Sequence, residues 1–372
     1  MKHRPLPHLA EALERRAEQN LLRVPPPRLA SSRTFCANDY LGLAERPLSE
    51  TAATAPGGAG ASRLVCGDTD AHGVLEGALA TWIGLPKALV FASGYAANVG
   101  TLATLLQPND VVFSDRANHA SLIDGMRLAK AQVVPYAHND LAALESAMTK
   151  HAPGPNGRRW VVTESYFSMD GDGPDLPPLR ALCDETSSLL VLDEAHAIGV
   201  FGAEGRGLAD AKGIAPDVFL GTLGKAIGAQ GAFVAGAPEL IAHLWNTARS
   251  FVFSTGMSPA LALHAADNVR RVRAGDALRE RLHRNTARLR EGMQRLGCTI
   301  HGHGHIVPWV IGEESAALDR ARALLEAGFH AQAIRPPTVP AGGARLRITT
   351  SAAHDPSDVD AFLAALERVL NR

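Results

Sequence analysis

The sequence lacks any long uninterrupted apolar run, and no stretch reaches the ~18 residues that a membrane-spanning helix requires. Its first residues include charges and prolines but no apolar segment, so a secretory signal peptide is not expected. Opposite charges nearly cancel, with 37 Lys and Arg against 38 Asp and Glu, which indicates neither a nucleic-acid-binding surface nor a charged tail. These absences predict a soluble cytoplasmic protein that binds neither membranes nor nucleic acid.

Cysteine is scarce too, since only Cys36, Cys66, Cys183 and Cys298 occur and they are widely spaced. This pattern argues against a disulfide scaffold and favours reduced, buried thiols. The glycine-rich segment 56–60 lacks both the Gly-Lys-Ser/Thr ending of a P-loop and the spacing of a dinucleotide fingerprint. A nucleophile-elbow sequence is missing, which argues against a serine hydrolase.

What the sequence does contain is a series of short apolar strands that alternate with helices between about residues 88 and 235. This alternation predicts an α/β fold with a mainly parallel sheet covered by helices on both faces, and a site at the carboxyl ends of the strands. We expect residues 41–258 to form this large domain and residues 259–372 a smaller α+β domain. Residues 1–40 are expected to pack with the smaller domain.

Two polar residues at the ends of apolar strands suggest a cofactor. Lys225 follows the run 218–222, and its amine, if neutral, can attack a carbonyl. Asp193 ends the run 189–192, where a carboxylate can keep a ring nitrogen protonated. Together they predict pyridoxal phosphate (PLP), with Lys225 forming the Schiff base and Asp193 holding the pyridinium. Taken alone, Lys225 would be read as a loop lysine whose ammonium reaches solvent.

A third strand end is suited to the phosphate group of PLP. Strand 88–92 runs into Ser93-Gly94 and then into a helix, and the free N–H groups at a helix start favour an anion. An ordinary serine-capped turn is the alternative interpretation. His119 also follows a strand end, where a structural role is common.

With these segments assembled, the chain resembles the α-oxoamine synthases, PLP enzymes of fold type I. The resemblance runs almost from end to end and rests on 38–43, 62–64, 92–98, 118–121, 163–172, 193–196, 222–225 and 333–342. The last of these segments is similar to the biotin-pathway branch of the family.

The resemblance implies a role for each matching residue. Lys225, His119, Asp193 and His196 would be catalytic, with the His119 ring stacked on the cofactor. The cofactor would also contact Gly94, Tyr95 and Thr222 at its phosphate, Ala195 at one ring face and Ser168 at the ring oxygen. Arg347 would bind the amino acid carboxylate, although Arg345 lies on the same strand face and competes for this role. Thr338 and Arg23 would contact the acyl substrate.

The implied reaction is the decarboxylative condensation of L-alanine with pimeloyl-CoA or a pimeloyl carrier protein in a cytoplasmic homodimer. Alternatives within the family are glycine C-acetyltransferase, 5-aminolevulinate synthase and serine palmitoyltransferase, which differ in pockets that a sequence describes poorly. A class II aminotransferase is a further alternative.

A metal-binding protein is the alternative interpretation from a functional class other than PLP enzymes. Cys298 lies near His301, His303 and His305 in the sequence, and these alternating histidines would share one strand face if the segment were extended. Their spacing matches no conventional ligand motif, so no metal is assigned.

Overall fold

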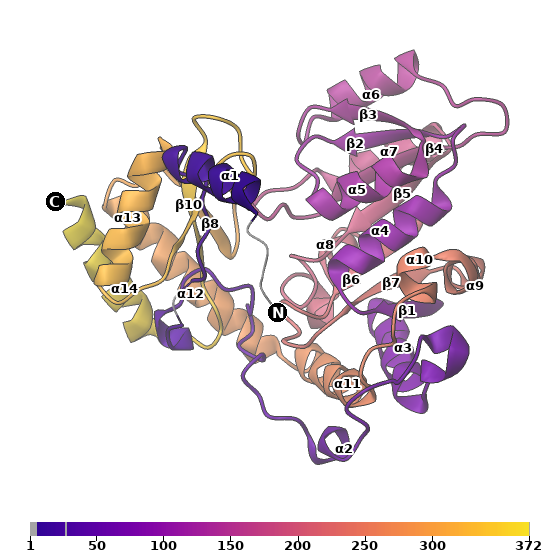
Figure 1. The fold of residues 1–372 in the computed structure, drawn as a ribbon, viewed down its shortest axis with the longest axis horizontal. Helices are drawn as coiled ribbons and strands as arrows, with labels where there is room; N and C mark the ends of the chain where they lie inside the picture. Colours follow the sequence, from indigo (N-terminus) through magenta and orange to yellow (C-terminus); the bar gives the residue numbers. More distant parts are fainter. Residues whose placement is uncertain (1–5, 27, 372) are drawn as a thin grey trace. The chain divides into compact units, whose positions relative to one another are not determined.

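The computed structural model describes residues 6–26 and 28–371, which form two compact units (Figure 1). The sheet unit comprises Asn38–Ser168 and Asp172–Arg281. The terminal unit comprises Met169–Gly171, Leu282–Arg372 and the N-terminal segment up to Ala37. Lys225 and Asp193 therefore belong to the sheet unit, whereas Arg23 and Arg347 belong to the terminal unit.

Seven strands form the sheet unit's central sheet in the order β1-β7-β6-β5-β4-β2-β3. Of these strands only β7 runs opposite to the others, because it pairs antiparallel with both β1 and β6. The strands are Lys87–Phe91 (β1), Val111–Asp115 (β2), Gln132–Tyr136 (β3), Arg159–Glu164 (β4), Ser188–Asp193 (β5), Val218–Thr222 (β6) and Ala232–Gly236 (β7). The carboxyl ends of the six co-directional strands thus meet at one edge of the sheet, where sites form in such folds.

Helices cover both faces of this sheet. Val112 and Val162 pack in a cluster with residues of α4, α5, α9 and α10, whereas Val111 and Val161 pack with α6 and α7. Alternate residues of a strand point to opposite faces, so both faces are apolar. The helices are Glu50–Ala53 (α2), Asp70–Ile83 (α3), Gly94–Leu105 (α4), Ala120–Ala129 (α5), Leu141–Lys150 (α6), Leu176–Glu185 (α7), Leu208–Ala211 (α8), Pro238–Thr247 (α9), Arg249–Val252 (α10) and Pro259–Arg273 (α11).

The terminal unit contains a three-stranded antiparallel sheet in the order β8-β10-β9. Its core includes Phe35, whose ring is fully buried and stacks on those of His354 and Phe362 with centroids 4.3 Å apart in each pair. This contact ties the N-terminal segment to the C-terminal helix. The elements are Pro7–Glu18 (α1), Asp276–Arg295 (α12, which begins in the sheet unit), Ile306–Gly312 (β8), Glu314–Glu326 (α13), Gln332–Ile334 (β9), Ala344–Thr349 (β10) and Pro356–Leu370 (α14).

Two segments differ from the sequence predictions. Helix α11 belongs to the sheet unit rather than beginning the smaller domain at residue 259, because it packs against α2 and α3. Residues 302–305 form bends and a turn instead of a strand, since Gly302 and Gly304 adopt left-handed backbone angles, with φ of 63° and 70°; before them, Ile300 forms an isolated bridge with Trp309. Among the described residues, no helix combines the length and apolar composition that a membrane crossing demands.

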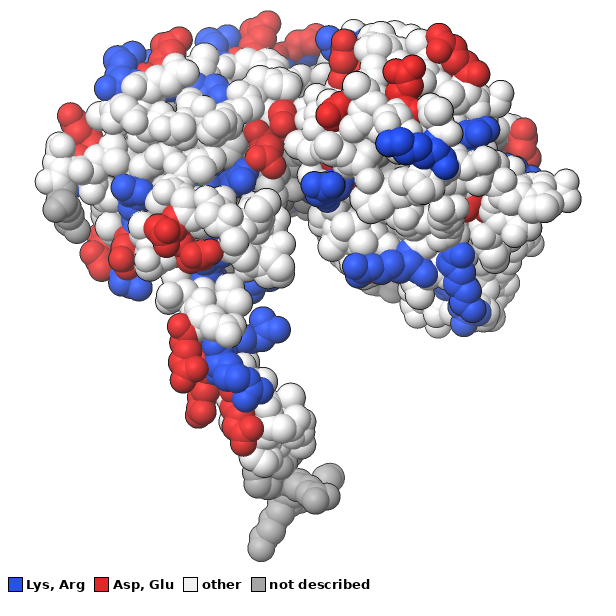
Figure 2. Space-filling model, turned by 90° about the horizontal axis from the view of Figure 1, so that it is seen from above, with Lys and Arg blue, Asp and Glu red and all other residues white. Residues whose placement is uncertain are grey.

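On the face drawn in Figure 2, Lys and Arg lie among Asp and Glu. This mixing agrees with the net charge of −1.

Candidate active site

Lys225 lies in the turn after β6, and its side chain contacts a histidine. Its Nζ atom lies 2.7 Å from Nε2 of His196, which is 5% exposed and follows β5. Nδ1 of the same ring lies 2.6 Å from the hydroxyl of the buried Tyr40, and this hydroxyl donates to Oδ1 of Asn38 at 3.0 Å. Because a phenol has only one proton to donate, His196 Nδ1 donates to Tyr40 and Nε2 accepts from Lys225. The lysine amine is therefore oriented by a directed chain of hydrogen bonds.

Asp193 ends β5 and is 5% exposed. Its Oδ2 accepts a hydrogen bond from Nδ2 of Asn98 at 2.8 Å, and its Oδ1 accepts one from the backbone N–H of Ala195 at 2.8 Å. The Asn98 amide also donates to the hydroxyl of Ser121 at 3.0 Å. These bonds fix the carboxylate, as required of a group that holds a proton on a ring nitrogen.

His119 is the residue that precedes α5, and its ring is partly exposed. Its Nδ1 lies 2.7 Å from the hydroxyl of Ser121 and accepts the Ser121 backbone N–H at 3.2 Å. Burial lowers the pKa of His119, the negative charge of Asp193 opposes this, and the charge of Lys225 lowers the pKa further. The ring is thus neutral near pH 7. Through Ser121 and Asn98 it is linked to Asp193.

The start of α4 is suited to an anion. Ser93 caps the helix by accepting the Ala96 backbone N–H at 3.1 Å. Among the described residues no hydrogen bond uses the amides of Gly94 or Tyr95. A Cβ atom on Gly94 would lie 3.9 Å from the Thr222 hydroxyl, so this hydroxyl faces the helix start. The Tyr95 hydroxyl instead donates to Asp124 at 2.6 Å.

The remaining predicted residue of the sheet unit, Ser168, lies half-buried in the turn after β4. The predicted substrate residues belong to the terminal unit. There Arg23 and Thr338 line one cavity of about 560 Å³ together with Arg335. Burial and the charge of Arg23 lower the pKa of Arg335. Among the ion pairs of the described residues, none involves Arg23 or Arg335. Other lining residues include Arg16, Leu318, Arg322, Leu325 and Ile334.

Arg345 and Arg347 are both buried on β10. The Arg345 guanidinium forms an ion pair with Asp170 and donates to the Met169 carbonyl at 3.1 Å. Its charge is therefore already compensated within the terminal unit, which argues against Arg345 as the carboxylate-binding residue.

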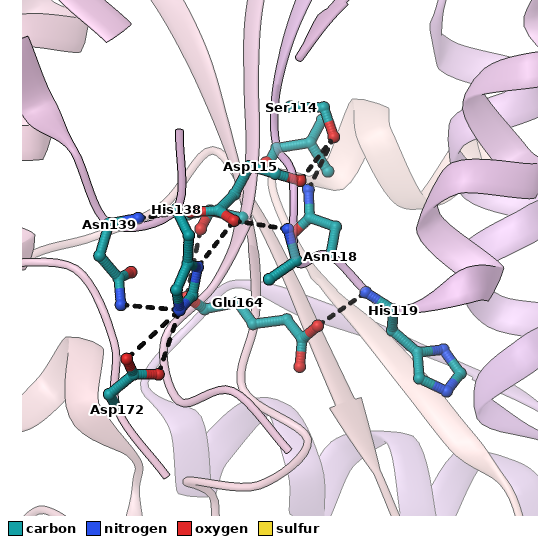
Figure 3. Close-up of polar contacts among 11 residues, drawn as sticks. Ser114, Asp115, Asn118, His119, His138, Asn139, Glu164 and Asp172 are labelled. Atoms are coloured by element: carbon teal, nitrogen blue, oxygen red, sulfur yellow. Dashed lines mark hydrogen bonds and ion pairs between the residues drawn. The ribbon is translucent and has the colours of Figure 1, made fainter. Parts of the chain in front are cut away.

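An acidic cluster holds a second histidine beside the site. The ring nitrogens of His138 lie 2.9 Å from Asp115 Oδ1 and 3.3 Å from the Asp172 carboxylate (Figure 3). Burial lowers the pKa of His138, but hydrogen bonds and charge from Asp115 and Asp172 outweigh it and raise the pKa to about 10. His138 is therefore a cation at neutral pH.

The histidine-rich segment does not form the predicted strand face. Among the described residues, no group of three or more His, Cys, Asp or Glu side chains could hold a metal ion. Gly302 and Gly304 adopt left-handed backbone angles between these histidines, so the segment is not the extended strand that their alternating spacing assumed.

The sheet unit fits PLP in its chemistry. An amine at Lys225, a fixed carboxylate at Asp193 and an anion site at the start of α4 all lie at the carboxyl edge of one sheet. They match the aldehyde, the ring nitrogen and the phosphate of the cofactor.

Sequence analysis assigned no role to Tyr40, Asn98, Ser121 or Glu164. A signal existed for Asn98, because a polar residue one turn into an otherwise apolar helix indicates a buried partner. Tyr40 could not be found, since it lies 156 positions from His196.

Comparison with known proteins decides the family. The model of aminotransferase class I and II matches residues 33–366. An 8-amino-7-oxononanoate synthase from Geobacter sulfurreducens is 47% identical over 345 residues, covering 90% of this chain and 88% of that protein. The chain belongs to the 8-amino-7-oxononanoate synthase family. Both the family resemblance and its biotin-pathway branch are thereby confirmed.

Solved structures agree with this family's fold. A serine palmitoyltransferase from Sphingomonas wittichii is similar with a TM-score of 0.89 and 27% identity, covering 98% of this chain and 96% of that one. A second structure, of SPT with PLP, has a TM-score of 0.90 and 26% identity, covering 97% of this chain and 96% of that one. The predicted fold type I architecture is confirmed.

Proposed function

We propose that this chain catalyses the PLP-dependent condensation of L-alanine with pimeloyl-CoA, or with a pimeloyl carrier protein. The products would be 8-amino-7-oxononanoate, CO2 and the free thiol. The observation that carries the proposal is the directed contact between Lys225 and His196 beside a fixed Asp193, in a chain 47% identical to a synthase of this name. We also propose that the enzyme is a cytoplasmic homodimer.

PLP, when bound, supplies an electron sink for the pair of electrons left on the alanine α-carbon. Lys225 would hold the cofactor and, when free, would accept the α-proton at Nζ. His196 orients Nζ by accepting its hydrogen bond. Asp193 would hold the proton at the cofactor's ring nitrogen, and Ala195 would lie at the ring. Gly94, Tyr95 and Thr222 would hold the phosphate, and Ser168 would bind the ring oxygen.

The carbon–carbon bond forms between the alanine α-carbon and the thioester carbonyl, and the thiolate leaves. The alanine carboxyl group then leaves as CO2, and the α-carbon gains a proton. His119 would hold the cofactor ring and orient the acyl group. Arg347 binds the alanine carboxylate.

The cavity of the terminal unit would take the far end of the acyl chain. A pimeloyl group ends in a carboxylate, which needs a cation at the end of an apolar channel. Arg23 and Arg335 supply guanidinium groups without an acidic partner among the described ion pairs, and Thr338 supplies a hydroxyl. A palmitoyl chain has no charge to match these residues.

The test combines the PLP absorption spectrum with a series of amino acids and a series of acyl thioesters. The purified protein is expected to show a PLP absorption band that changes with L-alanine more than with glycine or L-serine. CO2 release is expected only when pimeloyl thioester is also present. A response to glycine with acetyl-CoA or succinyl-CoA, or to L-serine with palmitoyl-CoA, would move the chain to a sister activity. Formation of a keto acid without CO2 would indicate an aminotransferase. Sedimentation analysis checks the homodimer.

A further inference from the structure

Glu164 is a buried carboxyl group that takes no part in the reaction proposed above. It ends β4, is 3% exposed, and its Oε1 accepts the backbone N–H of His119 at 2.7 Å (Figure 3). The register of β4 and β5 pairs Glu164 with Asp193. Two carboxyl groups therefore end neighbouring parallel strands, which lie ~4.8 Å apart in sheets.

Two adjacent carboxylates in a buried site repel each other, so such a pair holds a proton. Asp193 accepts bonds from Asn98 and Ala195, whereas Glu164 accepts only the His119 amide among the described hydrogen bonds. Asp193 thus accepts two of these hydrogen bonds and Glu164 one, and Glu164 is assigned as the member that keeps the proton.

The surrounding charges agree with this assignment. Burial and the charge of Asp193 raise the pKa of Glu164 well above its usual range, and Asp115 adds to this. The charge of Lys225 and the His119 amide oppose the increase without cancelling it. The charge of Asp115 is itself compensated by the cationic His138.

We propose that Glu164 is a positioning residue: its neutral carboxyl group anchors the backbone of His119, the residue that precedes α5, and with it the His119 ring, while leaving Asp193 as the negative charge at the cofactor's ring nitrogen. A protonated carboxyl group still accepts the amide through its carbonyl oxygen. This inference rests on the proposed function only for the identity of the cofactor, PLP.

Two substitutions separate the anchoring role from the charge. Glu164→Gln keeps an acceptor oxygen but cannot ionise, and Glu164→Leu removes the acceptor at similar volume. Glu145→Gln, on the exposed face of α6, is the control for the same chemical change away from the site. The main readout is the pH midpoint of the PLP absorption band in the loaded proteins, measured without any acyl substrate.

We expect Glu164→Gln to keep the wild-type midpoint, because it replaces one neutral group by another. Glu164→Leu should retain PLP but lower kcat by about 10- to 100-fold, the range expected when a substrate-orienting group is misplaced. Its KM for L-alanine should change less, since His119 is assigned to the cofactor ring and the acyl group.

A midpoint displaced by about one pH unit in Glu164→Gln would mean that Glu164 is ionised, and would overturn the inference. So would a Glu164→Leu variant with the kcat of Glu145→Gln. If Glu164→Leu does not fold, the Glu164→Gln titration alone decides. A wild-type protein without a PLP band would overturn the proposed function instead, whereas a wrong acyl assignment leaves this titration unaffected.

Discussion

The Nζ atom of Lys225 and the Nε2 atom of His196 lie 2.7 Å apart, although 29 residues separate them in the chain. The contact arises because β5 and β6 are parallel neighbours, so the turns that follow them share one edge of the sheet. The Tyr40 hydroxyl then fixes which nitrogen of His196 accepts from the lysine. The orientation of Lys225 thus depends on a residue far away in the chain.

Tyr40→Phe tests this dependence. The change leaves the buried Nδ1–H of His196 without its acceptor, which costs about 1–3 kcal/mol or lets the ring adopt the other tautomer. We expect kcat to fall about 10-fold and the pH midpoint of the PLP band to move. Tyr136→Phe removes another buried hydroxyl and is the control. An unchanged midpoint in Tyr40→Phe would contradict the directed chain.

Arg335→Ala tests the acyl cavity. Loss of the guanidinium should raise KM for pimeloyl-CoA by about 10- to 100-fold, because a carboxylate loses a charge-assisted hydrogen bond. KM for L-alanine should stay constant. Heptanoyl-CoA, which has the same chain length but no terminal carboxylate, is the matched control, and the variant should use it as well as the wild type does. An equal increase in KM for both thioesters would show that Arg335 has only a structural role in the terminal unit.

Arg345 and Arg347 are expected to respond differently to alanine substitution. Arg347→Ala should raise KM for L-alanine by at least about 10-fold. Arg345→Ala leaves Asp170 without its buried partner and should mainly lower the melting temperature. Steady-state kinetics and thermal denaturation of both variants check the assignment, and the reverse pattern would exchange the two roles.

His138 predicts a pH-dependent stability. Its folded pKa of about 10 exceeds the unfolded value, so its contribution is complete below about pH 6.5 and is lost as the pH rises through 10. We expect the free energy of unfolding of the wild type to decrease by about 2 kcal/mol over this window relative to His138→Gln. Denaturant titrations at several pH values measure it. Parallel pH curves for the two proteins would contradict the imidazolium between Asp115 and Asp172.

The family and the chemistry could be predicted from the sequence because their signals are local. Lys225 and Asp193 each end an apolar strand, and a polar group at such a position already indicates its chemistry. The alternation of strands and helices indicated the parallel sheet and hence the edge at which these ends meet. His119 and His196 followed from the family resemblance.

Other features required the folded chain. Period-two alternation put Arg345 and Arg347 on one face of β10, but only the position of Asp170 distinguishes them. Two glycines turned the histidine-rich segment away from the expected strand.

What the sequence alone determined is the set of reactive groups and the order of the elements that carry them. What only the tertiary structure decided is which distant groups contact them: Tyr40 at His196, Asn98 at Asp193 and Glu164 at His119. Local sequence specifies a strand and its last residue, because these depend on backbone propensity and burial. Hydrogen-bond partners depend on strand order and register, which the packing of the whole sheet establishes.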